Sequence, residues 1–133
     1  MEKAQPKLEC IASKILKSEA HELLNVADRI DESVVKAAKM LLKHDGKVIV
    51  CGVGKSGLIG QKIVATFCST GTQAVFLHAS DALHGDLGVY RPGDPTILIS
   101  KSGATDEVVR LIPLLREFNS PLIGIIGNNE ICD

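Results

Sequence analysis

Three hydroxyl side chains surround a glycine in the segment Ser100-Lys101-Ser102-Gly103-Ala104-Thr105. The segment follows an apolar run and precedes a stretch with helical periodicity, so it stands where a strand passes into a helix. Hydroxyl groups and backbone amides at a helix N-terminus bind phosphate oxygens, because the helix dipole favours negative charge there. The alternative is that Ser102 or Thr105 only caps the helix, which needs one hydroxyl rather than three. The segment therefore predicts a phosphate site made by Ser100, Ser102, Gly103 and Thr105.

A second pattern, Gly52-Val53-Gly54-Lys55-Ser56-Gly57, fits Gly-x-Gly-x-x-Gly after an apolar run. In the simpler interpretation, the glycines only permit a tight strand-to-helix turn. In the functional interpretation, an anion sits at the helix N-terminus and Lys55 reaches it. A dinucleotide site would also require an acidic residue at the end of the second strand, where this sequence has Leu77-His78-Ala79. The motif is not a P-loop, because Ile49 stands where the first glycine of that motif belongs.

Side chains that can carry protons gather in the segment His78 to Gly88 and at Glu107. Histidine changes charge near neutral pH, so it is the usual general acid or base. His84 is followed by Gly85 and Asp86, a sequence that resembles a positioned acid–base pair. His78 is as readily a hydrogen-bonded loop residue as a substrate contact. Glu107 either favours the positive end of a helix or does acid–base work on the sugar end of a bound phosphate ester.

Four apolar strands must position these residues. The pattern predicts strands over 47–51, 73–77, 96–99 and 122–126, separated by helices over 56–69, 80–87 and 105–118. This alternation is typical of right-handed βαβ units in a parallel sheet buried under helices. Ligands of such sheets bind beyond the carboxyl ends of the strands, which is where the three segments above lie.

Two helices are expected ahead of the first strand. Apolar residues from Leu8 to Ile30 form a stripe of more than six helical turns, and this stripe needs a partner surface. Asp31 can cap a second helix that stops near Gly46. We therefore expect a homo-oligomer, a homodimer or homotetramer, built partly through the first helix. The sequence stops soon after a buried-type strand, so we also expect the α/β core to be C-terminally incomplete.

Composition excludes several classes of protein. The formal net charge is -1 and aromatic residues make up 3% of the 133 residues, which argues against nucleic-acid and membrane-surface partners. The N-terminus has no signal-peptide pattern, and the apolar runs are too short to span a membrane. The four cysteines show no zinc-ligand spacing. We expect reduced thiols and a cytoplasmic location.

The motifs taken together resemble the D-arabinose 5-phosphate isomerases, enzymes with a sugar-isomerase (SIS) domain. The resemblance rests on four segments in order: Cys51 to Gly57, Ser69 to Thr72, Ala82 to Gly88 and Ser100 to Gly103. It covers about residues 41–127. It implies a three-layer SIS fold of flavodoxin-like topology with helices on both faces. It also implies one domain over 1–133, with N-terminal helices in 1–45 and a sugar-phosphate-binding core in 46–133.

The resemblance also implies an activity. These enzymes are intramolecular oxidoreductases that interconvert D-ribulose 5-phosphate and D-arabinose 5-phosphate, and their product feeds synthesis of the Kdo sugar of lipopolysaccharide. No cofactor is needed, no metal is required, and His84 can contact an inhibitory zinc ion. Lys55, His84 and Glu107 match catalytic positions. The remaining expected contacts are Ser56, Ser100, Ser102, Gly103 and Thr105 for phosphate, and Gly54, His78 and Asp86 for the rest of the substrate.

Two departures from the family pattern bear on turnover. Ala104 stands where many relatives have Glu, and a further Glu and His implicated in catalysis would lie beyond Asp133. The alternative function is therefore a non-catalytic SIS sensor that binds a sugar phosphate and signals to a partner. A nicotinamide enzyme is a third hypothesis, which the missing acidic residue after the second strand opposes.

Overall fold

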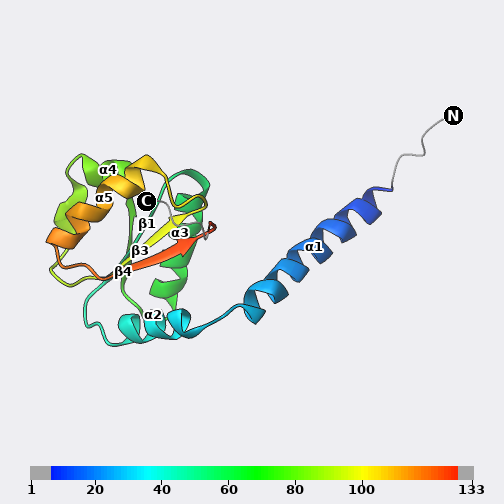
Figure 1. Cartoon of the computed structure of the whole chain (residues 1–133), viewed down its shortest axis with the longest axis horizontal. Helices are drawn as coiled ribbons and strands as arrows, with labels where there is room; N and C mark the ends of the chain where they lie inside the picture. The colour runs from blue at the N-terminus through cyan, green and yellow to red at the C-terminus, as the bar shows by residue number, and fades with distance from the viewer. Residues whose placement is uncertain (1–6, 129–133) are drawn as a thin grey trace. The chain divides into compact units, whose positions relative to one another are not determined.

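The chain divides into two compact units, 1–36 and 37–133, in a computed structural model that describes residues 7–128. The first unit holds α1 (Leu8–Asp28) and the beginning of α2 (Glu32–Leu42), both labelled in Figure 1. None of the residues of α1 is buried. Asp31 Oδ1 accepts a hydrogen bond of 2.8 Å from the Ser33 amide, which confirms the expected cap of α2.

The second unit is built on a parallel sheet of four strands. These are β1 (Val48–Gly52), β2 (Ala74–His78), β3 (Thr96–Ser100) and β4 (Leu122–Ile126), in the order β2-β1-β3-β4 (Figure 1). In the register, Val50 of β1 lies opposite Phe76 of β2 and Ile97 of β3. All residues of β1 and β3 are buried, because these strands are internal and covered on both faces. The sheet confirms the expected α/β class.

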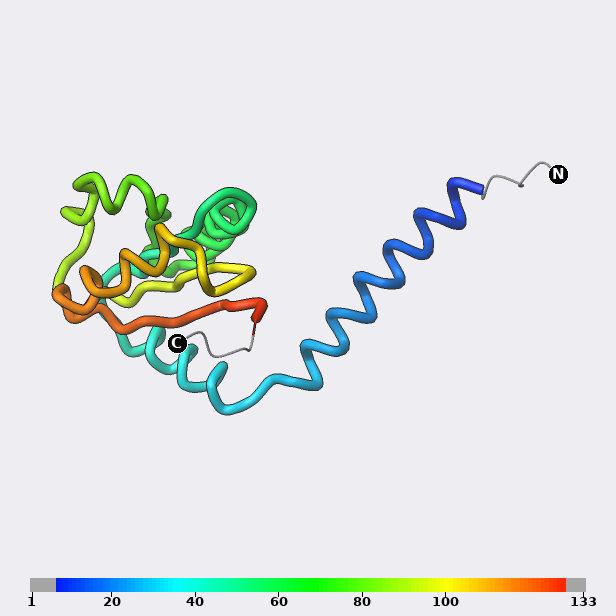
Figure 2. Tube along the Cα trace, turned by 45° about the horizontal axis from the view of Figure 1, so that its top comes forward, coloured from blue at the N-terminus to red at the C-terminus, as the bar shows by residue number. Residues whose placement is uncertain are grey.

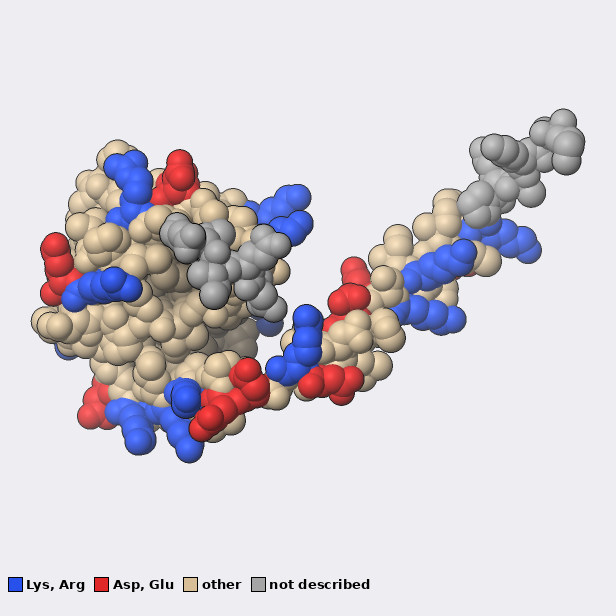
Figure 3. Space-filling model, viewed as in Figure 1, with Lys and Arg blue, Asp and Glu red and all other residues tan. Residues whose placement is uncertain are grey.

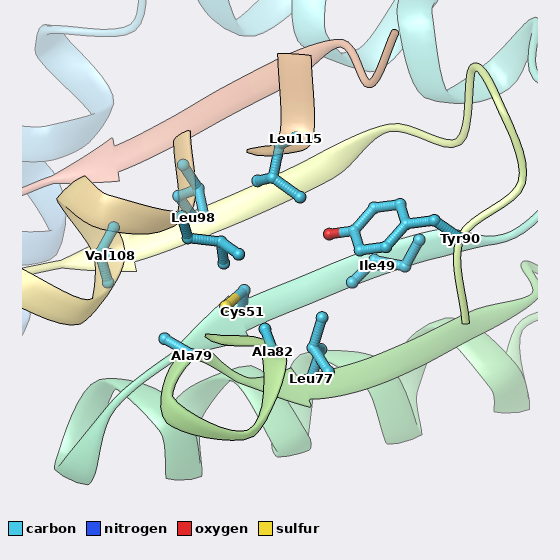
Figure 4. Packing of buried hydrophobic residues seen from close by; sticks show 10 residues of the cluster. Ile49, Cys51, Leu77, Ala79, Ala82, Tyr90, Leu98, Val108 and Leu115 are labelled. Carbon is cyan, nitrogen blue, oxygen red and sulfur yellow. The ribbon is translucent and has the colours of Figure 1, made fainter. Parts of the chain in front are cut away.

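Helices cover both faces of the sheet and complete the three layers. On one face, Ile49 and Cys51 of β1 pack with residues of α4 (Ala79–Leu83) and α5 (Asp106–Glu117), as Figure 4 shows. On the other face, Val48 and Val50 pack with Leu41 of α2 and with α3 (Gly54–Ser69). Alternate residues of β1 thus point to opposite helical layers, as the two-residue repeat of a strand requires.

One predicted helix is wrong. The sequence predicted a single helix over 80–87, but α4 ends at Leu83 and a short 3-10 helix, η1, covers Asp86–Val89. Gly85 between them has a φ of 125°, which a helix cannot accommodate and which glycine adopts without a Cβ clash. From β1 onward, the bounds of the other helices and strands lie within two residues of those predicted, whereas α2 ends at Leu42, four residues before the expected stop near Gly46.

A buried carboxylate ties the amino ends of the strands together. The Asp94 side chain is 2% exposed and accepts from Lys47 Nζ at 2.7 Å, while its other oxygen lies 2.9 Å from His44 Nε2. The Arg91 amide also donates to it at 2.9 Å. Burial by itself raises the pKa of Asp94, but the hydrogen bonds from Lys47, Arg91 and His44 outweigh this and lower it. The network fixes the end of the sheet opposite to the predicted site.

Charge on the surface is mixed. Figure 3 shows basic and acidic side chains interspersed on the viewed face of the second unit. Neither sign gathers there into the broad patch that a nucleic-acid surface requires. No helix within residues 7–128 is both long enough and apolar enough to cross a membrane.

Candidate functional site

The strand order creates a switch point between β1 and β3. From β1 the chain moves outward to β2, then returns to place β3 on the other side of β1. The loops that leave the carboxyl ends of β1 and β3 therefore diverge to opposite sides of the sheet, and the crevice between them is the usual ligand site of such folds. The glycine turn before α3 and the serine loop before α5 follow the two strands that meet at this switch point.

The glycine turn combines one conformational requirement with one close approach. Gly54 has a φ of 59°, and a Cβ there would meet nothing, so backbone conformation explains the glycine. A Cβ on Gly57 would lie 3.2 Å from the Gly52 carbonyl oxygen, so packing of α3 on β1 explains that glycine. Within the described residues, no side chain caps α3. The amides of its first turn are therefore open to solvent or to an anion.

Lys55 and Ser56 occupy that first turn. Lys55 is exposed and Ser56 is half-buried. Among residues 7–128, Lys55 forms no ion pair, so its charge is not neutralised by a neighbouring carboxylate. The exposed ammonium and the amides of the first turn can serve the same anionic ligand.

Hydrogen bonds inside the serine loop fix its shape. Ser100 is 2% exposed, and its Oγ accepts from the Gly103 amide at 3.0 Å. The Ser100 and Thr105 hydroxyls also share a hydrogen bond of 3.0 Å. Gly103 has a φ of 73°, which explains why glycine stands at this turn. Ser102 is exposed and accepts from the Ala104 amide at 3.1 Å.

The hydroxyls of this loop are not used to cap α5. Thr105 is the N-cap residue, yet its side chain makes no cap hydrogen bond. The Ser102 hydroxyl bonds to a residue that precedes the helix. The simple capping alternative therefore does not account for the loop. Ser100 and Thr105 form its interior, and Ser102 is the hydroxyl presented outward.

Glu107 lies in the first turn of α5 and is half-buried, whereas its neighbour Asp106 is exposed. Both carboxylates are in the turn where negative charge interacts favourably with the helix dipole. Of the two, Glu107 is the half-buried carboxylate, and it lies at the carboxyl end of the sheet, directly after the serine loop. Its position suits a group that acts on a ligand bound to that loop.

The expected residues after β2 form a second group, on α4 and η1. His78 Nδ1 accepts from the Ser80 amide at 3.3 Å and so caps α4, which leaves Nε2 as the ring nitrogen free to meet a ligand. His84 is the exposed C-cap residue of the same helix. Asp86 opens η1 and lines a hollow of about 400 Å³ with Gly85, Gly88 and Val89. Among residues 7–128, no hydrogen bond or ion pair joins His84 to Asp86, so the expected pair is not formed here.

Two kinds of chemistry find no support in this region. Burial raises the pKa of the Cys51 thiol to about 12, so this cysteine next to the glycine turn stays a neutral thiol and not a nucleophile. Within the described part of the chain, no three His, Cys, Asp or Glu side chains converge to hold a metal ion.

Sequence reasoning missed the contribution of β4. Gly127 and Ile126, at the end of that strand, contact the serine loop from outside. The only local signal was a glycine directly after an apolar run, which by itself indicates nothing more than a turn.

Known proteins match this chain in sequence and in fold. The family model of the SIS domain matches residues 40–130. Arabinose 5-phosphate isomerase KdsD of Pseudomonas aeruginosa is 45% identical over 102 residues, which cover 77% of this chain and 31% of that protein. The chain spans about a third of the length of the curated relatives that it matches.

Solved structures agree with the sequence matches. A proposed phosphosugar isomerase involved in capsule formation from Bacteroides fragilis superposes with a TM-score of 0.86 and 38% identity, over 94% of this chain and 67% of that one. An Escherichia coli protein in complex with arabinose 5-phosphate superposes with a TM-score of 0.78 and 38% identity, over 95% of this chain and 68% of that one. These proteins share the fold of this chain.

Proposed function

The chain belongs to the SIS domain family, and on that premise we propose that it is an aldose–ketose isomerase of a phosphorylated pentose. The proposed reaction interconverts D-arabinose 5-phosphate and D-ribulose 5-phosphate. The observation that carries the proposal is the internally bonded serine loop, which follows β3 at the switch point where the adjacent strand β1 leads into the glycine turn with Lys55. The 45% identity to an arabinose 5-phosphate isomerase supports the choice of this pentose.

The serine loop is the proposed anchor for phosphate. Ser102 offers an outward hydroxyl, and the backbone of the loop runs into the N-terminus of the 12-residue helix α5. A phosphate group carries close to two negative charges at neutral pH, so it gains from hydroxyl donors, amides and the dipole together. Ser100 and Thr105 hold the loop in shape, and Ser56 adds a hydroxyl from the first turn of α3.

Lys55, His84 and Glu107 are the proposed groups at the sugar end. A base removes the proton from C2 of the aldose and returns it to C1, while the O2 proton moves to O1 through a cis-enediolate. The charge that develops on the enediolate is stabilised by a cation, for which Lys55 is the candidate. Glu107 and His84 are the candidates for proton transfer, and Gly54, His78 and Asp86 are candidate contacts to the sugar.

The proposed reaction is balanced within the substrate. As C2 is oxidised from alcohol to ketone, C1 is reduced from aldehyde to alcohol, and no electron acceptor is consumed. No redox cofactor therefore enters the proposed mechanism, and the reaction belongs to the intramolecular oxidoreductases. By resemblance to the arabinose 5-phosphate isomerases, we place the reaction in the cytoplasm, in carbohydrate metabolism leading to Kdo and lipopolysaccharide.

The same proposal includes assembly with further copies of the chain. The helix α1 carries exposed apolar side chains along its length and has no buried residue. An amphipathic helix of 21 residues with its apolar stripe in water is unfavourable, because each exposed side chain forgoes the hydrophobic gain of burial. We propose a homodimer or homotetramer in which this stripe is covered.

Phosphorus and proton NMR of the protein mixed with D-arabinose 5-phosphate tests the function. The expected result is the appearance of D-ribulose 5-phosphate. The variant Ser102→Ala is expected to weaken binding about 10- to 100-fold, the effect of losing one hydrogen bond to a charged group. Ser18→Ala is the control, because Ser18 is an exposed serine on α1. Binding with no ketose would refute turnover by this chain, and no change of the phosphorus signal would refute the phosphate site.

A further inference from the structure

Gly127 stands against the backbone of the serine loop. An ideal Cβ placed on Gly127 would lie 2.7 Å from the carbonyl oxygen of Lys101 and 3.4 Å from the Lys101 Cα. The first distance is shorter than real Cβ contacts allow. Because the opposing atom belongs to the backbone, it cannot rotate away as the end of a side chain would. Any side chain at position 127 must therefore displace the loop or the end of β4.

The reason for glycine at this position is proximity and not backbone conformation. Gly127 is not among the described glycines with a positive φ. Alanine could adopt its backbone angles without strain, so the effect of a Cβ would come from the contact with Lys101 alone. This separates Gly127 from Gly103, where the positive φ already requires glycine.

Two further contacts join the end of β4 to the same loop. The Gly127 amide donates to the Ser100 carbonyl oxygen at 3.2 Å. A Cβ on Gly103 would lie 3.0 Å from Cγ2 of Ile126, so Ile126 sits directly against the turn of the loop. Figure 2 shows the end of β4, in red, beside the yellow segment that follows β3. The loop is thus held from inside by Ser100 and from outside by Ile126 and Gly127.

We infer that Gly127, together with Ile126, is a positioning residue for the phosphate-binding loop: the end of β4 sets where the backbone of Lys101, Ser102 and Gly103 lies. This inference rests on the proposed function, since it takes the loop to be the phosphate anchor. A Cβ at position 127 needs the Lys101 contact to open from 2.7 to about 3.4 Å, the beginning of ordinary contact, which is a shift of about 0.7 Å. A displacement of this order at a binding loop costs roughly tenfold or more in affinity.

The test compares two glycine substitutions, one within β4 and one directly after it. Gly127→Ala adds a Cβ against backbone, whereas Gly124→Ala adds one against the flexible Ile126 side chain, at 3.2 Å from Cγ1. Calorimetry with D-arabinose 5-phosphate and with inorganic phosphate measures affinity for the wild-type chain and both variants. Amide NMR spectra of the free proteins report the positions of residues 101–105. Gly127→Ala is expected to lose at least tenfold in affinity and to shift these amide signals. Gly124→Ala can act on the loop only through the rotatable side chain of Ile126, so it is expected to change both less than Gly127→Ala does.

The outcomes separate this inference from the proposed function. If the wild-type chain binds and Gly127→Ala binds equally well, the inference is overturned and the proposed function stands. If the wild-type chain binds neither ligand, the proposed function fails and the inference fails with it. Should Gly127→Ala not fold, Ile126→Ala replaces it, because it removes the support of Gly103 without adding an atom. A several-fold loss of affinity is expected for Ile126→Ala, and unchanged affinity would overturn the inference.

Discussion

Replacing Ser100 by alanine distinguishes a hydroxyl that shapes the serine loop from one that binds phosphate directly. Ser100 is 2% exposed, and its Oγ makes hydrogen bonds of 3.0 Å with the Gly103 amide and the Thr105 hydroxyl. The substitution removes both hydrogen bonds and leaves the Gly103 amide and the Thr105 hydroxyl without the Ser100 hydroxyl as a partner. It adds no bulk, so the effect comes from the lost hydrogen bonds.

The expected loss of stability follows from those two bonds. Each contributes about 1 kcal/mol net, so Ser100→Ala should lower the free energy of unfolding by about 2 kcal/mol. In a chain of this length, about 4 °C of melting temperature corresponds to 1 kcal/mol, which gives a decrease of about 8 °C. Loosening of the Gly103 turn should also weaken binding of D-arabinose 5-phosphate by roughly tenfold or more, since the loop backbone is no longer held in place.

Thermal unfolding and calorimetric titration measure the two effects, with Ser102→Ala as the matched variant. Ser102 is exposed, so its substitution should change the free energy of unfolding by no more than about 0.5 kcal/mol while weakening the binding of phosphate. A melting temperature of Ser100→Ala within about 2 °C of the wild type would refute the reasoning that Ser100 organises the loop.

Three further predictions concern the rest of the molecule. Asp94→Asn should lower the free energy of unfolding at pH 7 by about 3 kcal/mol, because it breaks a buried ion pair with the partly exposed Lys47. The pKa of Asp94 is lowered in the folded state. The stability that its carboxylate contributes is therefore fully present above the pKa of the unfolded state, near pH 4, and is lost as the pH falls through the pKa of the folded state. Chemical denaturation from pH 2 to 7 should show this loss of stability in the wild type and not in Asp94→Asn. Cys51, with its pKa raised to about 12, should resist alkylation at pH 8, while the exposed Cys10 should react. Peptide mass spectrometry measures both modifications, and rapid modification of Cys51 in the folded protein would contradict its burial. Light scattering at micromolar concentration should give a mass above that of one 14.2 kDa chain, and a monomer would contradict the proposed role of α1.

Much of the fold could be predicted because its signals are local. The apolar runs that became β1 and β3 are continuous, as strands covered on both faces must be, and the 3.6-residue repeat of α1 extends over its whole length. The helix over 80–87 was predicted wrongly because its composition favoured continuation. The positive φ of Gly85 divides it, and glycine is compatible with many conformations, so the sequence did not reveal the break.

The candidate site could be predicted only in part. The serine loop and the glycine turn carry their own signals, namely hydroxyls around a glycine and glycines before a helix. The sequence could not predict that Ser100 shapes the loop while Ser102 presents its hydroxyl outward, since the two are the same residue type two positions apart. Burial separates them: the last residue of β3 turns its hydroxyl inward, and Ser102 lies beyond the strand, exposed to solvent.

The sequence by itself determined the class of fold and the order of its elements, and it picked out the segments proposed to bind phosphate, because each of these follows from the types and spacing of neighbouring residues. The tertiary structure alone decided which distant residues meet. Asp94 bonds to His44 and Lys47 across 50 and 47 positions of the chain, and Gly127 contacts Lys101 only because β3 and β4 pair with Ser100 opposite Ile126. Such contacts depend on strand order and register, which are set by the packing of the whole sheet and not by any one segment.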